Sequence, residues 1–296
     1  MIKKAKKAKK PEEKPEKPGN IESEFRKEIG KINPYLCLVD SAVGFFVAET
    51  KSNSNQAKFT REIAGKYGHH NLYTEHLNLD DLRKFVHLNH IALINSKAES
   101  ACKRVQEIIW KESKKVEENL KKEVRDHVKG DFYRRTILEI HCYNERNSSF
   151  AKKDADEKVN EQIFADYLGY TELKVLDYLR KIRNNEFHNS KDRNTDLLEN
   201  FNAIDQDLLN KKYNLQLNEP KNIEFTDVLL LSKVWQECVR QICRKCLNTS
   251  DIYESLKLRY KAVSSKRRKN GIIQTLKQDY LQTDEEISII MGNWVG

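Results

Sequence analysis

The sequence predicts an all-α protein, a helical bundle with charged extensions at both ends. Only 10 glycines and 5 prolines occur among the 296 residues. That is too few for the frequent turns of an all-β sandwich or for the phosphate loop of a Rossmann-type enzyme. Apolar residues recur at intervals of three and four along several segments, which is the spacing of helices that bury one face. A chain of this length can bury a core without disulfides or a structural metal.

The N-terminal part divides at residue 22. Residues 1–22 are rich in lysine, glutamate and proline and carry almost nothing to bury, so we expect a disordered basic arm. Residues 23–80 form an N-terminal extension whose fold the sequence leaves open. Within it, residues 34–49 are apolar enough for either a short strand or a buried helix, and residues 55–67 predict a short helix.

The regular helical pattern extends over residues 81–250, which we expect to form the bundle. Asp80 and Asp81 are suitable N-terminal caps for a helical pattern that has no breaker before Gly130, so one very long helix or two joined by a kink would fit. Further helices are predicted over 131–146, 159–168, from Thr171 onward, 197–208 and 227–247. Residues 251–296 are a charged C-terminal extension, helical in patches.

The net charge of +9 is concentrated at the two ends. Residues 1–20 carry eight of the lysines, and a second basic run near the C-terminal end includes Lys266, Arg267, Arg268 and Lys269. Basic clusters attract RNA, DNA or an anionic membrane, and the alternative is a solvated surface that keeps the chain soluble. We assign the four residues of the second run as candidate RNA-binding residues.

The cysteines and histidines predict neither disulfides nor a metal site. Because the N-terminal sequence has no apolar signal segment, the six cysteines indicate reduced thiols in the cytoplasm. Cys243 and Cys246 have the C-x2-C spacing but no second pair at zinc-site spacing, so they fit the apolar face of a helix better. His69 and His70, with His76, fit a loop better than a metal site. The longest apolar run, 42–48, is too short to cross a bilayer, so we expect no membrane partner.

One segment carries chemistry, the sequence LRKIRNNEFHN at 179–189. It places Arg183, Asn184 and His188 where an amphipathic helix gives way to a polar loop, and Asn184 and His188 share a helix face. An arginine binds phosphate oxygens bidentately, and a histidine titrates near neutral pH and can take a proton from a ribose hydroxyl. A structural alternative is that these side chains only cap the last carbonyls of the helix.

This segment, within a helical bundle, resembles the HEPN superfamily (higher eukaryotes and prokaryotes nucleotide-binding domains). The resemblance implies a metal-independent endoribonuclease of bacterial defence, abortive-infection or toxin–antitoxin type, which needs no cofactor. It implies catalytic roles for Arg183 and His188, with Asn184 as their polar partner, in a cleft between two protomers of a homodimer. Arg135 and His141 on the preceding helix could support the same cleft or be ordinary surface residues.

Two other functions fit the sequence. The HEPN resemblance also covers members without nuclease activity, which would make the chain a non-catalytic adaptor that binds RNA or a partner protein, such as an antitoxin or another defence component. A membrane-active effector that uses its basic ends is the third possibility, and the absence of a strongly amphipathic terminal helix disfavours it.

Overall fold

The computed structural model describes residues 16–74, 77–112, 132–145, 157–188, 194–261 and 265–292. All regular secondary structure in these ranges is helical, which confirms the predicted all-α class. The helices are α1 (Pro18–Ser52), α2 (Gln56–Lys66), α3 (Leu79–Glu112), α5 (Phe132–Asn144), α6 (Glu157–Leu168), α7 (Tyr170–His188), α8 (Asn194–Asn202), α9 (Gln206–Tyr213), α10 (Phe225–Lys245), α11 (Thr249–Arg259), α12 (Ser265–Asp279) and α13 (Asp284–Gly292).

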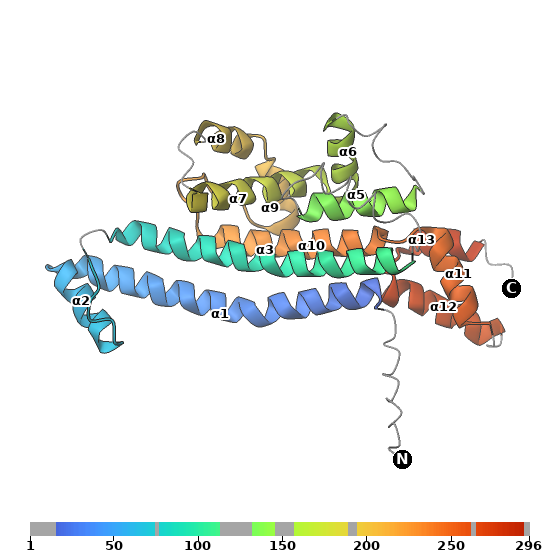
Figure 1. Ribbon diagram of the computed structural model, residues 1–296, viewed down its shortest axis with the longest axis horizontal. Coiled ribbons are helices and arrows are strands. Elements are labelled where there is room, and N and C mark those ends of the chain that lie inside the picture. The colour runs from blue at the N-terminus through green and yellow to red at the C-terminus, as the bar shows by residue number, and fades with distance from the viewer. Residues whose placement is uncertain are drawn as a thin grey trace, which may run out of the picture.

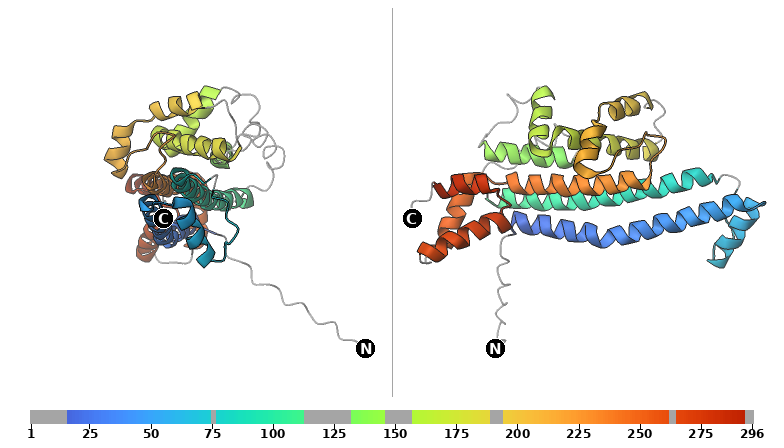
Figure 2. Two further views of the ribbon diagram at one scale, coloured as in Figure 1. Left: turned by 90° about the vertical axis from the view of Figure 1, so that its left-hand side faces the viewer. Right: turned by 180° about the vertical axis from the view of Figure 1, so that it is seen from behind.

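The long helices are arranged in layers (Figure 1). Helices α3 and α10 run side by side through the middle, and both pack against α1. On the other side of this central pair, α5 packs against α3, and α6 and α7 pack against α10. Helices α8 and α6 lie outermost on that side (Figure 2). The layering therefore separates α1 from α7 by the thickness of the central pair.

Helix α10 is the central element because it is apolar around much of its circumference. Its buried residues include Val228, Leu231, Val234 and Cys238, and they face α1, α3, α6 and α7. Asp227 fixes its first turn, since this buried carboxylate accepts hydrogen bonds from the backbone N–H groups of Glu224 and Asn218. A capped helix that packs against four others is the expected centre of a bundle core.

An aromatic cluster joins the layers around Trp235 of α10. Its ring stacks on Phe132 at a centroid separation of 5.4 Å and meets Tyr133 edge-on at 5.7 Å. Its indole N–H donates to Asn95 Oδ1 of α3 at 2.8 Å. One side chain therefore connects α3, α5 and α10, and its polar atom is satisfied in the core.

The N-terminal part departs from the sequence expectations. Residues 18–22, expected in the arm, form the first turn of α1 and bury Ile21 completely, and residues 1–15 lie outside the described part. Residues 34–49 are helical but largely exposed, whereas we expected a strand or a buried helix. Ile21, Phe25 and Ile29 recur every four residues and join the main core, so α1 belongs to the bundle. This apolar stripe is one residue wide and is flanked by charged residues, so the hydrophobic pattern of the sequence did not indicate a core helix there.

Helix α1 is also the one described helix that is long and apolar enough, by length and composition alone, to cross a membrane. Only 11% of its most apolar stretch is buried inside the molecule. The longest uninterrupted apolar run, 42–48, does not reveal this helix, because the apolar residues of α1 are interspersed with polar ones.

The C-terminal helices α11, α12 and α13 surround a small core of their own, formed by Ile252, Leu256, Ile272, Leu276, Tyr280, Ile287 and Ile290. This unit rests on the first turn of α1, where Gly19 lies so close to the backbone of Gln278 that a Cβ on residue 19 would be 1.9 Å from its carbonyl oxygen. The other expected helices are present as well, except that the 197–208 pattern divides into α8 and α9. Whether the pattern from Asp80 continues as one helix beyond Glu112 lies outside the described residues.

The Trp235 cluster predicts a large effect of truncation. Trp235→Ala removes a fully buried ring and leaves Asn95 Oδ1 without its donor, so the free energy of unfolding should fall by about 3–5 kcal/mol. Urea denaturation followed by circular dichroism measures this loss. Leu258→Ala on the exposed face of α11 is the control and should change it by less than about 0.5 kcal/mol. A loss below about 1 kcal/mol for Trp235→Ala would contradict the role given to this cluster.

Candidate functional site

The residues of the predicted motif lie in the last turns of α7. Gly169 begins the helix with a φ of +92°, a left-handed conformation that favours glycine. Leu173, Leu176 and Leu179 are buried and hold α7 against the bundle. The helix continues to His188, so the motif is helical throughout and its residues follow helical spacing.

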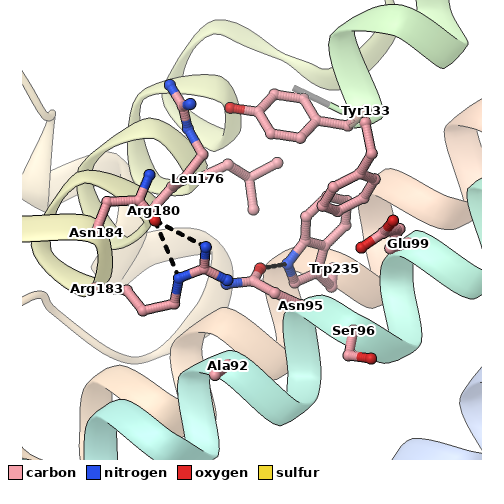
Figure 3. A pocket seen from close by; sticks show the side chains of 11 residues that line it. Ala92, Asn95, Ser96, Glu99, Tyr133, Leu176, Arg180, Arg183, Asn184 and Trp235 are labelled. Carbon is pink, nitrogen blue, oxygen red and sulfur yellow. Dashed lines mark hydrogen bonds between the residues drawn. The ribbon is translucent and has the colours of Figure 1, made fainter. Parts of the chain in front are cut away.

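A surface pocket of about 150 Å³ opens between α3, α5, α7 and α10 (Figure 3). Arg183 and Asn184 belong to its wall. The cleft implied by the HEPN resemblance lies between two protomers, so this pocket within one chain does not test it. The full lining is Ala92, Asn95, Ser96 and Glu99 from α3, Phe132 and Tyr133 from α5, Leu176, Arg180, Arg183 and Asn184 from α7, and Trp235 from α10.

Arg183 and Asn184 bind each other directly. The guanidinium donates from Nε at 3.2 Å and from Nη2 at 2.7 Å, both to Asn184 Oδ1 (Figure 3). Both side chains are half-buried. A guanidinium has five N–H donors, so Nη1 and the second hydrogen of Nη2 are not used by this contact. The amide thus fixes the orientation of the arginine and leaves it able to bind an anion.

A second arginine of the pocket, Arg180, is placed by a buried carboxylate. Asp177 lies 3.8 Å from Arg180 Nη2, accepts a hydrogen bond from Arg134 Nη2 at 2.6 Å, and accepts another from the hydroxyl of Tyr133. These contacts tie α5 to α7 at the side of the pocket. Arg180 and Asn184 are four residues apart and therefore share a face of α7.

The pocket favours a small anion. The charged residues of its lining are two arginines, Arg180 and Arg183, and one carboxylate, Glu99 of α3. Asn95 already accepts from the indole of Trp235, so its oxygen is engaged. The guanidinium of Arg183 suits a phosphate or a similar oxyanion, whereas that of Arg180 points away from it, toward Tyr133 (Figure 3).

His188 ends α7 one helical turn beyond Asn184. Helical spacing places this position on the same side of α7 as Arg180 and Asn184. Its side chain lies outside the described part of the structure. The fold therefore brings Arg183 and Asn184 into one pocket and places the backbone of His188 one helical turn beyond Asn184 on α7.

The other predicted site residues do not line this pocket. Arg135 and His141 are half-buried on α5, which contributes Phe132 and Tyr133 to the pocket instead. Their role in the cleft stays a prediction. Lys269 is exposed on α12, and the side chains of Lys266, Arg267 and Arg268 lie outside the described part. The basic run belongs to the C-terminal unit and not to the pocket.

Sequence reasoning missed Arg180, Asn95, Glu99 and Trp235. Arg180 had a usable signal, because it precedes Arg183 by three positions and Asn184 by four in a helix that we had already expected. The other three residues reach the pocket through packing between helices distant in sequence, and no local pattern marks them.

The cysteines and histidines show no metal-site geometry where they are described. In the described ranges, no group of three or more His, Cys, Asp or Glu side chains is arranged to hold a metal ion. Cys243 and Cys246 are buried in the main core as predicted, and burial raises the pKa of Cys246 to about 12. His69 and His70 are exposed in the loop after α2, whereas His76 lies outside the described residues.

A buried ion pair lies apart from the pocket, between α1 and α3. His87 is only 2% exposed; its Nε2 lies 2.8 Å from Asp40 Oδ1, and its Nδ1 lies 3.1 Å from the carbonyl oxygen of Ile223. Both ring nitrogens of His87 are therefore in contact with oxygen atoms, one from a carboxylate and one from a backbone carbonyl. Arg83 donates to the same oxygen of Asp40. This network joins α1, α3 and the segment before α10.

Comparisons with protein-family models, with curated proteins and with solved structures found no match to this chain.

The Asp40 network predicts a pH-dependent stability. Partial burial acts to raise the pKa of Asp40, but hydrogen bonds from His87 and Arg83 outweigh it and lower that pKa below its ordinary value. A carboxylate with a lowered folded-state pKa stabilises the fold above its unfolded pKa, near 4, and loses that contribution as the pH falls through the folded pKa. Asp40→Asn should therefore cost about 2 kcal/mol at pH 7.

Urea denaturation at pH 7 and at pH 3 measures this prediction. The difference between the wild-type protein and Asp40→Asn should shrink at the lower pH, because pH 3 lies below the unfolded pKa of an aspartate, where this contribution is already being lost. Glu199→Gln, at an exposed position of α8, is the matched control and should show no such pH-dependent difference. An equal loss at both values of pH would contradict the ion pair.

Proposed function

We propose that this chain is a metal-independent endoribonuclease of HEPN type that acts in bacterial defence or as a toxin, with RNA as its substrate. One observation carries the proposal: Arg183 lines a pocket with its guanidinium oriented by Asn184, and His188 follows one turn later on the same helix. The all-helical bundle and the arginine-rich wall of the pocket support it.

The scissile phosphate would bind to Arg183 of α7. Arg183 offers its Nη1 and one Nη2 hydrogen, and Arg180 adds a second positive charge from the same wall. Negative charge increases on the non-bridging oxygens as the phosphorus becomes five-coordinate. Guanidinium groups fixed in advance stabilise that charge without having to reorganise.

His188 would act as the general base. It takes the proton of the ribose 2′-hydroxyl, the 2′-oxygen bonds to the adjacent phosphorus, and the bond from phosphorus to the 5′-oxygen breaks. The leaving 5′-oxygen takes up a proton from an acid. The products are a 2′,3′-cyclic phosphate and a 5′-hydroxyl, and the sequence of steps uses no redox partner.

A two-fold arrangement would supply a separate acid. The 2′-oxygen and the leaving 5′-oxygen lie on opposite sides of the phosphorus, and two copies of the motif across a two-fold axis would place one histidine as base and the other as acid. The homodimer implied by the HEPN resemblance therefore suits the chemistry of the proposal. An antitoxin or another defence component would control access to this shared site.

The function is tested by RNA cleavage in EDTA. His188→Ala and Arg183→Ala should each lower the cleavage rate at least about a hundredfold, because they remove the base and the charge-stabilising group. Arg183→Lys should restore little, since lysine keeps the charge but loses the planar arrangement of donors. Electrophoresis of end-labelled RNA measures the rate. A 2′,3′-cyclic phosphate at the product end is identified because phosphatase removes it only after acid has opened the ring.

His70→Ala and Arg61→Ala, at exposed positions outside the pocket, are the matched controls and should leave the rate unchanged. A 2′-O-methylated RNA lacks the nucleophile and should not be cleaved. Cleavage that requires magnesium or continues unchanged in His188→Ala would contradict the proposal. RNA binding without cleavage would identify the non-catalytic adaptor instead.

The shared site predicts a specific crosslink. In a Cys37→Ser background, which removes the exposed cysteine, His188→Cys should be joined to the same position of a second copy by a short bismaleimide reagent. Leu258→Cys on α11 is the control and should give little crosslinked dimer. Non-reducing gel electrophoresis measures the product. Equal crosslinking at both positions, or none at position 188, would contradict two motifs facing each other.

A further inference from the structure

Helix α1 carries an exposed apolar stripe along its second half. Tyr35, Leu38 and Phe45 are 71%, 68% and 69% exposed, and Ala42 between them is exposed as well. Along the chain, residues 35, 38, 42 and 45 follow one another at steps of three, four and three positions, which is the spacing of the apolar seam of a coiled coil. Large apolar side chains in such a continuous line indicate a surface that another element covers.

The stripe lies on the side of α1 that faces away from the bundle. Asp40 bonds to Arg83 and His87 of α3, and Gly44 lies beside the guanidinium of Arg83, so this side of α1 packs on α3. At about 100° per residue, the stripe is centred about half a turn around the helix from Asp40. The bundle therefore occupies one side of α1 and leaves the seam on the other open.

The stripe is complementary to itself in the antiparallel direction. If two antiparallel copies of α1 are aligned so that their crossing point lies at the level of residue 40, Tyr35 meets Phe45 of the partner and Leu38 meets Ala42 of the partner. In the same register Lys31 meets Glu49 of the partner, and each pair forms twice. Lys31 and Glu49 are both exposed, and neither makes an ion pair within the described residues. Apolar contacts and opposite charges thus match in one alignment.

We propose that the exposed face of α1 binds the same face of a second copy of this chain, as an antiparallel helix pair with Lys31–Glu49 ion pairs at both ends. The contact is isologous, because the same surface is used on both subunits. The apolar seam supplies the affinity, and the flanking charges fix the direction and the register.

A lipid surface is the competing occupant, and the charges argue against it. An anionic membrane attracts basic residues at both ends of an apolar stripe, whereas this stripe has Lys31 at one end and Glu49 at the other. Helix α1 also packs on α3 and α10, so in this structure it is a member of the bundle.

This contact is independent of the proposed ribonuclease site. Helix α7 lies across the α3–α10 layer from α1, so pairing through α1 leaves the pocket accessible (Figure 2). If copies also meet through α7, two different two-fold contacts would join them into tetramers or longer assemblies. Failure of the α1 contact would leave the cleavage chemistry untouched, and failure of cleavage would leave the α1 contact untouched.

Sedimentation velocity with the full chain tests the apolar seam. Leu38→Glu places a charge at the centre of the seam and should halve the mass of the assembly, and the circular dichroism spectrum should stay unchanged because residue 38 touches no core. Leu258→Glu is the matched control, since Leu258 is 76% exposed on α11, and should keep the wild-type mass. A wild-type protein that sediments as a 34.8 kDa monomer at about 100 μM would overturn the proposal.

Charge reversal tests the direction and the register. Lys31→Glu and Glu49→Lys each replace two attractive contacts by two repulsive ones and should each weaken self-association about tenfold. An equimolar mixture of the two variants should recover the wild-type affinity, because every contact between the unlike chains is attractive again. Failure of the mixture to recover, or unchanged association of the single variants, would overturn the antiparallel pairing. A different result would assign the surface to lipid instead. In that case the wild-type protein would not self-associate but would bind phosphatidylserine vesicles, and Leu38→Glu would abolish this binding.

Discussion

The contacts of Trp235 position the helices that surround the candidate site. Its ring faces Phe132 and Tyr133 of α5, and its N–H is bound to Asn95 of α3, so the two helices are held at a fixed separation by one rigid side chain. On the α3 side the neighbouring residues Ala92 and Ser96 are small, whereas α7 presents long arginines from the other wall. Small residues opposite long, charged ones cannot close into a dry core. The pocket exists because the aromatic cluster fills the space below it and the arginines remain hydrated above it.

The polar contacts around the pocket order its arginines before any ligand binds. Asp177 holds Arg134 and the hydroxyl of Tyr133 and lies beside Arg180, while Asn184 holds Arg183. A guanidinium already fixed by such contacts loses less conformational freedom when an anion arrives. The conformational entropy of these side chains is lost during folding, when Tyr133 and Arg134 of α5 bond to Asp177 of α7. The site is therefore a product of the tertiary structure, although most of its charged residues come from one helix.

The sequence predicted the class of fold: the low glycine content and the three- and four-residue spacing indicated a helical bundle. Arg183 and Asn184 lie near the end of α7 and line one pocket, and their role in a site stays a prediction. The membership of α1 in the bundle was not predictable, since its core contacts come from single apolar residues among charges. Glu99, Asn95 and Trp235 could not be found either, because only the packing of α3 and α10 against α7 brings them to the pocket. The HEPN resemblance rests on the motif and stays a proposal.

The close fit of Gly19 against α12 has a consequence for how the molecule unfolds. Within the described residues, the core of the C-terminal helices contains seven buried side chains, and these helices meet the bundle at the first turn of α1. A core of that size contributes a small part of the total stability, so this unit can open while the bundle stays folded. Its amide hydrogens would then exchange with solvent faster than those of α10, and the first turn of α1 would fray with it. The chain thus combines one cooperative bundle with a weaker terminal unit, and proteolysis would start at the junction near Leu247, which touches both cores.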